Sequence, residues 1–334
     1  MELKKLFEKF KEQKIAVIGD LMIDHYLWGS VDRISAEAPV PVVDIKREEY
    51  RLGGAANVIS NITSLNVSAD VYGICGNDKY AEELNRLLDL IHVSGKFVVP
   101  DPERPTTLKS RIMAGHQQVT RCDFEKRHFI SSYIEDILLK KIKENIKNYS
   151  AVILEDYNKG LLSDRIITET IKMANEHQIP VTVDPKFKNF FSYRGVKVFK
   201  PNFLELQKNL GIEIQNDAEL RAAAKEIFHR INPEYLIITR GEKGLIIFNR
   251  QMEEFIIPTF AREVFDVSGA GDTMISVLTI CIACGCSIEE SAIIANHAAG
   301  AVCGKMGIAP VTQKDIELSV EYNEMIKEKT ENDL

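Results

Sequence analysis

The chain has 334 residues, of which 45% are hydrophobic, and carries a formal net charge of −7 with an isoelectric point near 5.7. This length and composition suit one large α/β domain with a full core and an insertion. The negative charge argues against a nucleic-acid-binding protein, which would show a basic face. The N-terminus lacks the apolar segment of a signal peptide, and no apolar run reaches membrane-spanning length. We therefore expect a cytoplasmic protein that binds neither membrane nor nucleic acid.

The cysteines are predicted to be small buried thiols, as is usual in a reducing compartment. Three of them have the spacing Cys281-x-x-Cys284-x-Cys286, which resembles a metal site at first sight. This spacing falls at the end of an apolar helical segment without a second ligand pair nearby, so core packing is favoured over metal binding. The six cysteines are Cys75, Cys122, Cys281, Cys284, Cys286 and Cys303.

Short apolar, β-branched runs alternate with helical patterns along most of the chain. This alternation favours an α/β fold of three layers, α/β/α, in which a mainly parallel sheet carries helices on both faces. Strands are predicted at 14–19, 69–75, 151–155, 180–183, 196–199, 235–238 and 245–248. Helices are predicted at 54–65, 78–91, 131–147, 163–177, 203–210, 216–230, 270–284, 287–303 and 313–324.

Two regions interrupt this alternation, at about 26–46 and 96–124. Both contain β-leaning segments with hardly any helical periodicity, including one around Val98. We interpret them as a small β-sheet inserted into a single domain that spans residues 1–334. Such a sheet could act as a lid and, through an exposed apolar face, as the contact of a homodimer. A pair of surface hairpins with no moving part is the alternative.

Polar residues directly follow several predicted strands. In an open parallel sheet the ligand crevice lies outside the carboxyl ends of the strands. Each residue alone could be a turn former, but their coincidence at strand ends favours a binding cleft. They are Gly19-Asp20, Asp156, Asp184, Asn202 and Thr239-Arg240-Gly241.

The turn Gly269-Ala270-Gly271-Asp272 stands directly before an apolar helix and is the most informative motif of the chain. Its free backbone N–H groups and the helix dipole suit phosphate oxygens, so residues 269–271 are predicted to form an anion hole. Asp272 in the same turn could accept a hydroxyl proton, as phosphoryl transfer to an alcohol requires. The helix N-terminus is expected to keep Asp272 ionised and hence weakly basic. A plain helix start is the alternative.

Other motifs also allow a functional and a structural interpretation. Gly53-Gly54 opens a second helix in which Asn57 could bind a hydroxyl group, or the pair could serve only tight packing. Asp24 could accept bonds from sugar hydroxyls or could be solvated. Asn202 and Glu205 have the spacing of a helix N-cap and its N3 partner, and both could also lie near a phosphate or its hydrated Mg²⁺. Asn296 lies in a small-residue helix suited to packing against adenine.

Together these segments resemble the ribokinase-like (PfkB) carbohydrate kinases. The glycine pair before Asn57 resembles the first signature of that family, and residues 266–272 resemble the second. Within the family the chain is most similar to kinases of D-glycero-β-D-manno-heptose 7-phosphate. That similarity is carried by Arg33-Ile34-Ser35-Ala36-Glu37-Ala38-Pro39-Val40-Pro41-Val42 and by Asp156-Tyr157-Asn158-Lys159-Gly160. Some of these kinases are fused to a nucleotidyltransferase with a His-x-Gly-His motif; this chain lacks it and resembles the stand-alone form.

The resemblance implies ATP-dependent phosphorylation of the anomeric hydroxyl of this heptose phosphate, in ADP-heptose and lipopolysaccharide core synthesis. Asp272 would be the base, and ATP would lie beside Thr239, Gly241, Gly244 and Asn296. Mg²⁺ would lie near Glu205, through water, with Asn202 close by; a monovalent-cation requirement stays open. The acceptor site would be formed by Asp24, Gly53, Gly54, Asn57, Asp156 and a set of cations that pair with the 7-phosphate, namely Lys109, Arg111, Lys159, Lys186 and Arg121.

Three alternatives belong to other classes. A kinase for ribose, fructose or fructose phosphate would keep Asp272 and need fewer cations at the acceptor site. A non-catalytic nucleotide- or sugar-binding module would lack the base or the anion turn, and both are present here. A dinucleotide dehydrogenase is disfavoured, because the first strand leads into Gly19-Asp20-Leu21-Met22 and not into a GxGxxG loop.

Overall fold

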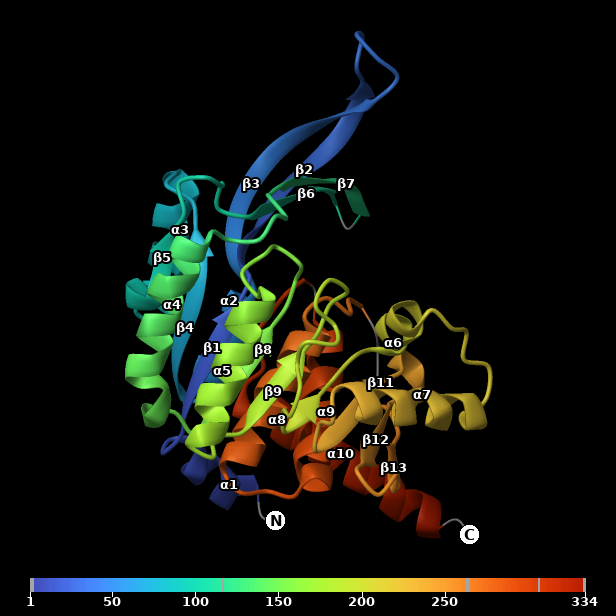
Figure 1. The fold of residues 1–334 in the computed structure, drawn as a ribbon. Coiled ribbons are helices and arrows are strands. Elements are labelled where there is room, and N and C mark those ends of the chain that lie inside the picture. The colour runs from blue at the N-terminus through green and yellow to red at the C-terminus, as the bar shows by residue number, and fades with distance from the viewer. Residues whose placement is uncertain (1–2, 116, 262–264, 306, 333–334) are drawn as a thin grey trace.

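A computed structural model of the chain describes residues 3–115, 117–261, 265–305 and 307–332. Its centre is a nine-stranded sheet in the order β13-β12-β11-β10-β9-β8-β1-β4-β5 (Figure 1). The pairs from β10–β11 across to β4–β5 are parallel, whereas β12 pairs antiparallel with β11 and β13. The strands are β1 (Lys14–Gly19), β4 (Ser68–Cys75), β5 (Val98–Pro100), β8 (Ala151–Glu155), β9 (Val181–Asp184), β10 (Val198–Phe199), β11 (Tyr235–Thr239), β12 (Leu245–Asn249) and β13 (Glu254–Ile257).

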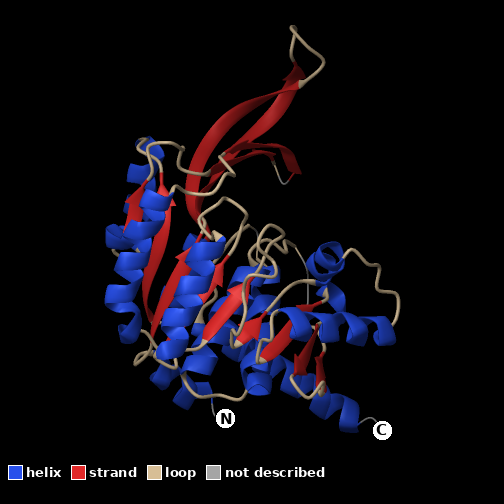
Figure 2. Cartoon of the chain, in the orientation of Figure 1, coloured by secondary structure: helices blue, strands red, loops and turns tan. Residues whose placement is uncertain are grey.

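Helices cover both faces of this sheet and enclose two apolar cores, as expected of a three-layer α/β/α fold (Figure 2). Alternate residues of β1 enter opposite cores: Ile15 and Val17 belong to one, Ala16 and Ile18 to the other. The first face carries α1 (Leu3–Phe10), α2 (Ala55–Ser64), α3 (Lys79–Leu90), α8 (Ala270–Ala283), α9 (Ile288–Cys303) and α10 (Gln313–Asn332). The second carries α4 (Ser132–Asn145), α5 (Asp164–Glu176), α6 (Phe203–Leu210) and α7 (Asp217–Arg230).

A second, four-stranded sheet projects from the body and is here called the lid. Its order is β3-β2-β6-β7, with β2 (Leu21–Ile34), β3 (Pro41–Gly54), β6 (Leu108–Ala114) and β7 (Gln117–Phe124). The long hairpin of β2 and β3 reaches well beyond the body (Figure 1). Because β2 follows β1 after one residue and β3 runs directly into α2, the lid is joined to the body without a flexible linker.

The structure agrees with the predicted α/β architecture and corrects several details. The lid hairpin occupies 21–54 and not only 26–46. Val98 was assigned to the lid, but it begins β5, which pairs with β4 in the main sheet, where Val99 is buried. Helix α1 and strand β13 were not predicted. Both acquire their structure from tertiary contacts, α1 by burying one apolar face on the body and β13 by extending a sheet edge.

None of the helices in the described part of the chain combines the length and apolar character that a membrane span requires.

Candidate active site

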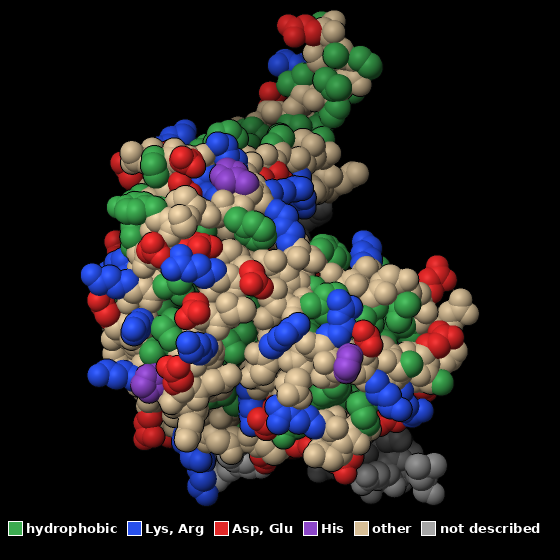
Figure 3. Space-filling view, viewed as in Figure 1, with side chains coloured by type: hydrophobic (Ala, Val, Ile, Leu, Met, Phe, Trp, Pro, Cys, Tyr) green, Lys and Arg blue, Asp and Glu red, His purple; other side chains and the backbone are tan. Residues whose placement is uncertain are grey.

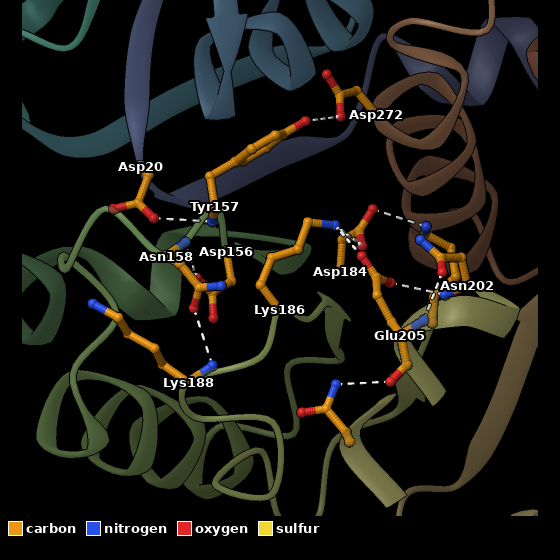
Figure 4. Close-up of polar contacts among 12 residues, drawn as sticks. Asp20, Asp156, Tyr157, Asn158, Asp184, Lys186, Lys188, Asn202, Glu205 and Asp272 are labelled. Atoms are coloured by element: carbon orange, nitrogen blue, oxygen red, sulfur yellow. Dashed lines mark hydrogen bonds and ion pairs between the residues drawn. The ribbon is translucent and has the colours of Figure 1, made fainter. Parts of the chain in front are cut away.

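The predicted polar residues lie at the point where the chain direction across the sheet reverses. β1 and β8 are neighbours, but from β1 the chain builds outward through β4 and β5, whereas from β8 it builds through β9 to β13. Such a switch point opens a crevice at the carboxyl ends of the strands. Asp20 follows β1 and accepts bonds from the backbone N–H groups of Tyr157, Lys159 and Leu161, which fixes the loop after β8 (Figure 4).

The glycine pair at the end of β3 is explained by close approaches at this point. A Cβ at Gly53 would lie 2.3 Å from Oδ2 of Asp24, so glycine leaves room for that carboxylate. Gly54 has φ +57°, and a Cβ there would lie 2.5 Å from the carbonyl oxygen of Asp20. Both glycines are therefore required where the lid meets α2.

Asp272 lies in the first turn of α8 and is buried, 5% exposed. Its Oδ1 accepts a bond from the hydroxyl of Tyr157 at 2.6 Å (Figure 4). Its Oδ2 accepts a bond from Nδ2 of Asn57 at 2.6 Å. Burial raises the pKa of Asp272 to about 6, although both hydrogen bonds favour the carboxylate. The expectation that the helix N-terminus leaves Asp272 weakly basic was wrong, because desolvation outweighs it.

The turn before Asp272 has the backbone of an anion site. Gly269 is the N-cap of α8 in the left-handed region, with φ 81°, and a Cβ there would lie 3.0 Å from Nδ2 of Asn57. The N–H of Ala270 turns back to the carbonyl of Val267 at 3.2 Å, so it is less available than predicted. The N–H groups of the next residues, Gly271 and Asp272, have no partner within the helix by position and point out of its N-terminus.

Next to this turn lies a cluster of charges from β9, β10 and α6. Lys186 contacts Oε1 of Glu205 at 2.5 Å and Oδ1 of Asp184 at 3.6 Å, while Lys200 contacts Asp184 at 2.8 Å (Figure 4). Although burial acts to raise it, these ammonium groups hold the pKa of Asp184 below its ordinary value. Glu205 also forms the predicted capping box with Asn202, which confirms the structural interpretation of that pair.

A cavity of about 350 Å³ opens on the other side of the turn. Four of the six residues predicted to lie beside the nucleotide line it, together with Ala270 and Gly271 of the turn before Asp272; the four are Thr239, Gly241, Gly244 and Asn296. The other two, Asn202 and Glu205, do not line this cavity. Asn296 donates to the carbonyl of Pro258 at 2.6 Å. Its neighbour His297 stacks on Phe260, with the ring centres 3.8 Å apart, so this histidine has a packing role.

Cations from the lid and the loop after β8 gather near Tyr157, which bonds to Asp272. Arg111 forms an ion pair with the buried Asp24, Lys109 lies 5.9 Å from the ring centre of Tyr157, and Lys159 contacts Glu125 at 2.6 Å. Burial, and then repulsion from Lys159, lowers the pKa of Lys109. Lys and Arg side chains are visible below the lid in Figure 3.

Three predicted acceptor residues have other surroundings. Arg121 is half-exposed on β7 and pairs with Asp123 at 2.8 Å. Lys186 belongs to the charge cluster beside Glu205 and not to the lid cations. Asp156 is buried, and its oxygens accept bonds from the Tyr193 hydroxyl and the Asn158 N–H, so it supports the loop.

Two groups at the centre of the site were missed. Tyr157 connects Asp272 to the cations, since Lys109 and Lys186 lie 5.9 and 5.5 Å from its ring centre. Glu155 is completely buried at the end of β8, and burial, followed by the nearby Asp184 and Asp272, raises its pKa well above the ordinary value. Their position at the end of a predicted strand was the one sequence feature that could have identified them. A tyrosine and a glutamate there carry no distinctive spacing.

Comparison with known proteins shows the family of the chain. A profile described as pfkB family carbohydrate kinase matches residues 12–315. The chain belongs to this family. It is 42% identical over 306 residues to the bifunctional protein HldE of Aliarcobacter butzleri, and 42% identical over 312 residues to that of Haemophilus influenzae. These alignments cover 92% and 93% of the chain but 64% of each relative, so the chain spans less than two thirds of their length.

Solved structures of other pfkB-type kinases share the fold. Arabidopsis thaliana ribokinase, complexed with ribose and ATP, has a TM-score of 0.71 at 19% identity, covering 92% of this chain and 98% of that one. Escherichia coli phosphofructokinase-2, in complex with potassium, has a TM-score of 0.75 at 18% identity, covering 93% and 99%. The ribokinase-like fold is thus established for this chain.

The raised pKa of Asp272 predicts that Asp272→Asn stabilises the protein. Between about pH 4 and 6 the carboxyl of Asp272 is protonated in the folded protein but ionised in the unfolded chain. Above this range the folded protein must hold a buried charge, and this lowers its free energy of unfolding. At pH 8 the substitution should increase the free energy of unfolding by about 1–3 kcal/mol, from a shift of roughly two pKa units. The gain should disappear near pH 4. Urea unfolding at both pH values measures it, and an equal change at both would contradict the prediction.

Proposed function

We propose that the chain transfers the γ-phosphoryl group of ATP to the anomeric hydroxyl of D-glycero-β-D-manno-heptose 7-phosphate. The observation that carries the proposal is the position of Asp272. The residues directly before it, Ala270 and Gly271, line a cavity of about 350 Å³, and its partner Tyr157 lies beside the lid cation Lys109. We further propose that the reaction takes place in the cytoplasm, where ATP is available, and supplies the 1,7-bisphosphate for ADP-heptose synthesis.

The residues of the site support in-line phosphoryl transfer. Asp272 orients the anomeric hydroxyl and accepts its proton while that oxygen bonds to the γ-phosphorus and the bond to the ADP oxygen breaks. Each carboxylate oxygen of Asp272 has a lone pair left beside its bond to Asn57 or Tyr157. The N–H groups at the start of α8 stabilise the charge on the transferring group.

The chemistry of the charge cluster fits Mg²⁺ held mainly by phosphate and water. Among the described residues no group of three His, Cys, Asp or Glu side chains could hold a metal ion. Mg²⁺ in such kinases needs only one or two carboxylates, and Glu205 is well placed to bind it through water, with Asn202 beside it. When bound, the ion would supply positive charge that neutralises the phosphate groups of ATP. Lys186 shares Glu205 and would orient it.

The lid cations support a phosphorylated acceptor. Lys109 and Lys159 repel one another, and a phosphate group between them would relieve that repulsion and pair with Arg111. Asp24 and Asn57 provide an acceptor and a donor for sugar hydroxyls near Asp272. The resemblance of residues 33–42 to heptose 7-phosphate kinases supports this sugar over ribose or fructose.

ADP release tests the substrate. With Mg-ATP we expect turnover of heptose 7-phosphate and a kcat/KM lower by about 10²–10⁴ for the unphosphorylated heptose, because the buried cations would remain unpaired. Ribose and fructose 6-phosphate are tested as alternative substrates. Each assay is run with and without potassium chloride to test the monovalent-cation requirement. Asp272→Asn should lower the rate by about 10²–10⁴. Preference for fructose 6-phosphate or ribose would identify that sugar as the substrate in place of the heptose phosphate. Absence of turnover with every sugar would indicate a non-catalytic binding module.

Tyr157→Phe should move the acid limb of the pH–rate profile. For the wild type, kcat/KM should fall about tenfold per unit below about pH 6, where Asp272 becomes protonated. Loss of the Tyr157 hydroxyl removes a bond that favours the carboxylate of Asp272. The apparent pKa of the acid limb should therefore increase by about 1 unit. The matched control is Tyr193→Phe, which removes a similar bond to Asp156. An unshifted limb for Tyr157→Phe would contradict this role.

Glu205→Gln separates the capping role of Glu205 from its charge. Glutamine keeps the capping box of α6, so the helix should be unaffected, but the group beside Lys186 becomes neutral. We expect the KM for Mg-ATP to rise about tenfold or more, by analogy with losses of metal-orienting groups. Glu290→Gln changes the same position of the capping box of α9 and should leave KM unchanged. Equal effects would indicate a purely structural role.

We also propose that the lid forms a homodimer contact. Apolar side chains are exposed along its arm, including Ile34 at 62% and Val40 at 51%, and this apolar surface is visible in Figure 3. Light scattering should give twice the chain mass of 37.7 kDa for the wild type. The double variant Ile34→Glu, Val40→Glu should be monomeric, whereas Leu90→Glu on α3 should remain dimeric. A monomeric wild type would overturn the proposal.

A further inference from the structure

The end of α8 opposite Asp272 brings two cysteine thiols together through its backbone. Gly285 has φ 81° and follows Cys284, the C-cap of the helix. The N–H of Cys286 bonds to the carbonyl of Cys281 at 3.1 Å, and the N–H of Gly285 bonds to that of Ile282 at 3.0 Å. This pair of bonds defines a Schellman motif, in which the side chains at the first and last positions normally pack on one another. Here both side chains are thiols, and a hydrogen-bonding interaction between them shifts the pKa of each thiol.

The two thiols differ in access. Cys281 is completely buried in the core under α8, whereas Cys286 is partly exposed. Cys286 lines a cavity of about 470 Å³ together with Lys197 and Arg250. This cavity lies at the end of the sheet away from the kinase site, since it is bordered by residues that precede or begin β9, β10 and β11. A small solute can therefore reach Cys286 directly. Cys281 can react only with a Cys286 that has already been modified.

The surroundings of Cys286 favour its thiolate. The bond from Cys281 lowers the pKa of Cys286, against burial and the nearby Glu290. Cys286 also directly precedes Ser287, the N-cap of α9, so it lies at the positive end of that helix dipole. Burial raises the pKa of Cys284 to about 12, which keeps the neighbouring thiol protonated and unreactive.

We propose that Cys281 and Cys286 form an oxidation site that hydrogen peroxide converts into an intrachain disulfide. The Cys286 sulfur attacks the peroxide, an S–O bond forms, the O–O bond breaks, and the departing hydroxide takes a proton to become water. The Cys281 sulfur then attacks the sulfenic acid, an S–S bond forms, the S–O bond breaks, and a second water leaves with the Cys281 proton. Two thiols lose two electrons, and one peroxide is reduced to two waters. This proposal is independent of the kinase function.

Metal binding is a weaker explanation of the same residues. The described part of the chain contains no group of three His, Cys, Asp or Glu side chains that could hold a metal ion, and the Cys281–Cys286 pair alone gives two ligands. A structural zinc site needs four.

The experiment counts thiols in the full chain. Cys122 is exposed on the lid, so Cys122→Ser serves as the background, which leaves five of the six thiols. The folded protein receives a small excess of peroxide, catalase ends the reaction, and N-ethylmaleimide labels the remaining thiols after denaturation. Intact mass should show a loss of two labels, restored by dithiothreitol, and fragmentation should assign the bond to Cys281 and Cys286.

Three variants separate the steps. Cys284→Ser is the matched control and should still lose two labels. Cys281→Ser should stop at the sulfenic acid of Cys286, which dimedone traps as an adduct. Cys286→Ser should keep all of its labels and form no adduct at Cys281. Retention of all labels in the background protein, a bond that includes Cys284, or equal oxidation of Cys286→Ser would overturn the proposal.

Discussion

The carboxylate of Asp272 is held by donors from two other parts of the chain, Asn57 on α2 and Tyr157 after β8. Without these bonds a buried carboxylate would be protonated at neutral pH, because burial alone strongly disfavours its charge. With them, the pKa of Asp272 is about 6, which leaves it ionised and still basic near neutral pH. The same two bonds align the N-terminus of α8 with the lid and with the switch point of the sheet. The positions of the turn before Asp272, the lid cation Lys109 and the cavity lined by Thr239 and Asn296 follow from this alignment.

The loop after β8 depends in turn on a second buried carboxylate. Asp20 is 2% exposed and accepts three backbone N–H groups from residues 157–161. Burial raises the pKa of Asp20, and these three bonds oppose that rise. Asp20 thus presents Tyr157 to Asp272 and Lys159 to the lid without contacting a reacting group itself. The strand-end carboxylates Asp20 and Asp156 therefore hold loops, whereas the proposed base, Asp272, lies at the start of a helix.

The lid is placed by short-range geometry. Gly53 leaves space for Asp24, and Asp24 pairs with Arg111 on β6, so two lid strands are joined at the base of the sheet. Because β2 and β3 continue directly from β1 and into α2, displacement of the lid would shift Asn57 as well. This coupling connects the position of the lid to that of Asn57, the donor that bonds to Asp272.

The sequence by itself determined the alternation of strands and helices, the capping box of Asn202 and Glu205, and the glycine turn before Asp272. These features follow from local periodicity and from backbone groups that neighbouring residues satisfy, so they are readable in short segments. Only the tertiary structure decided that Val98 belongs to the main sheet, that Lys186 pairs with Glu205, and that Tyr157 bonds to Asp272, 115 positions away. It also decided the basicity of Asp272. The charge state of a carboxylate depends on how completely water is excluded around it, and that exclusion is produced by packing between distant elements.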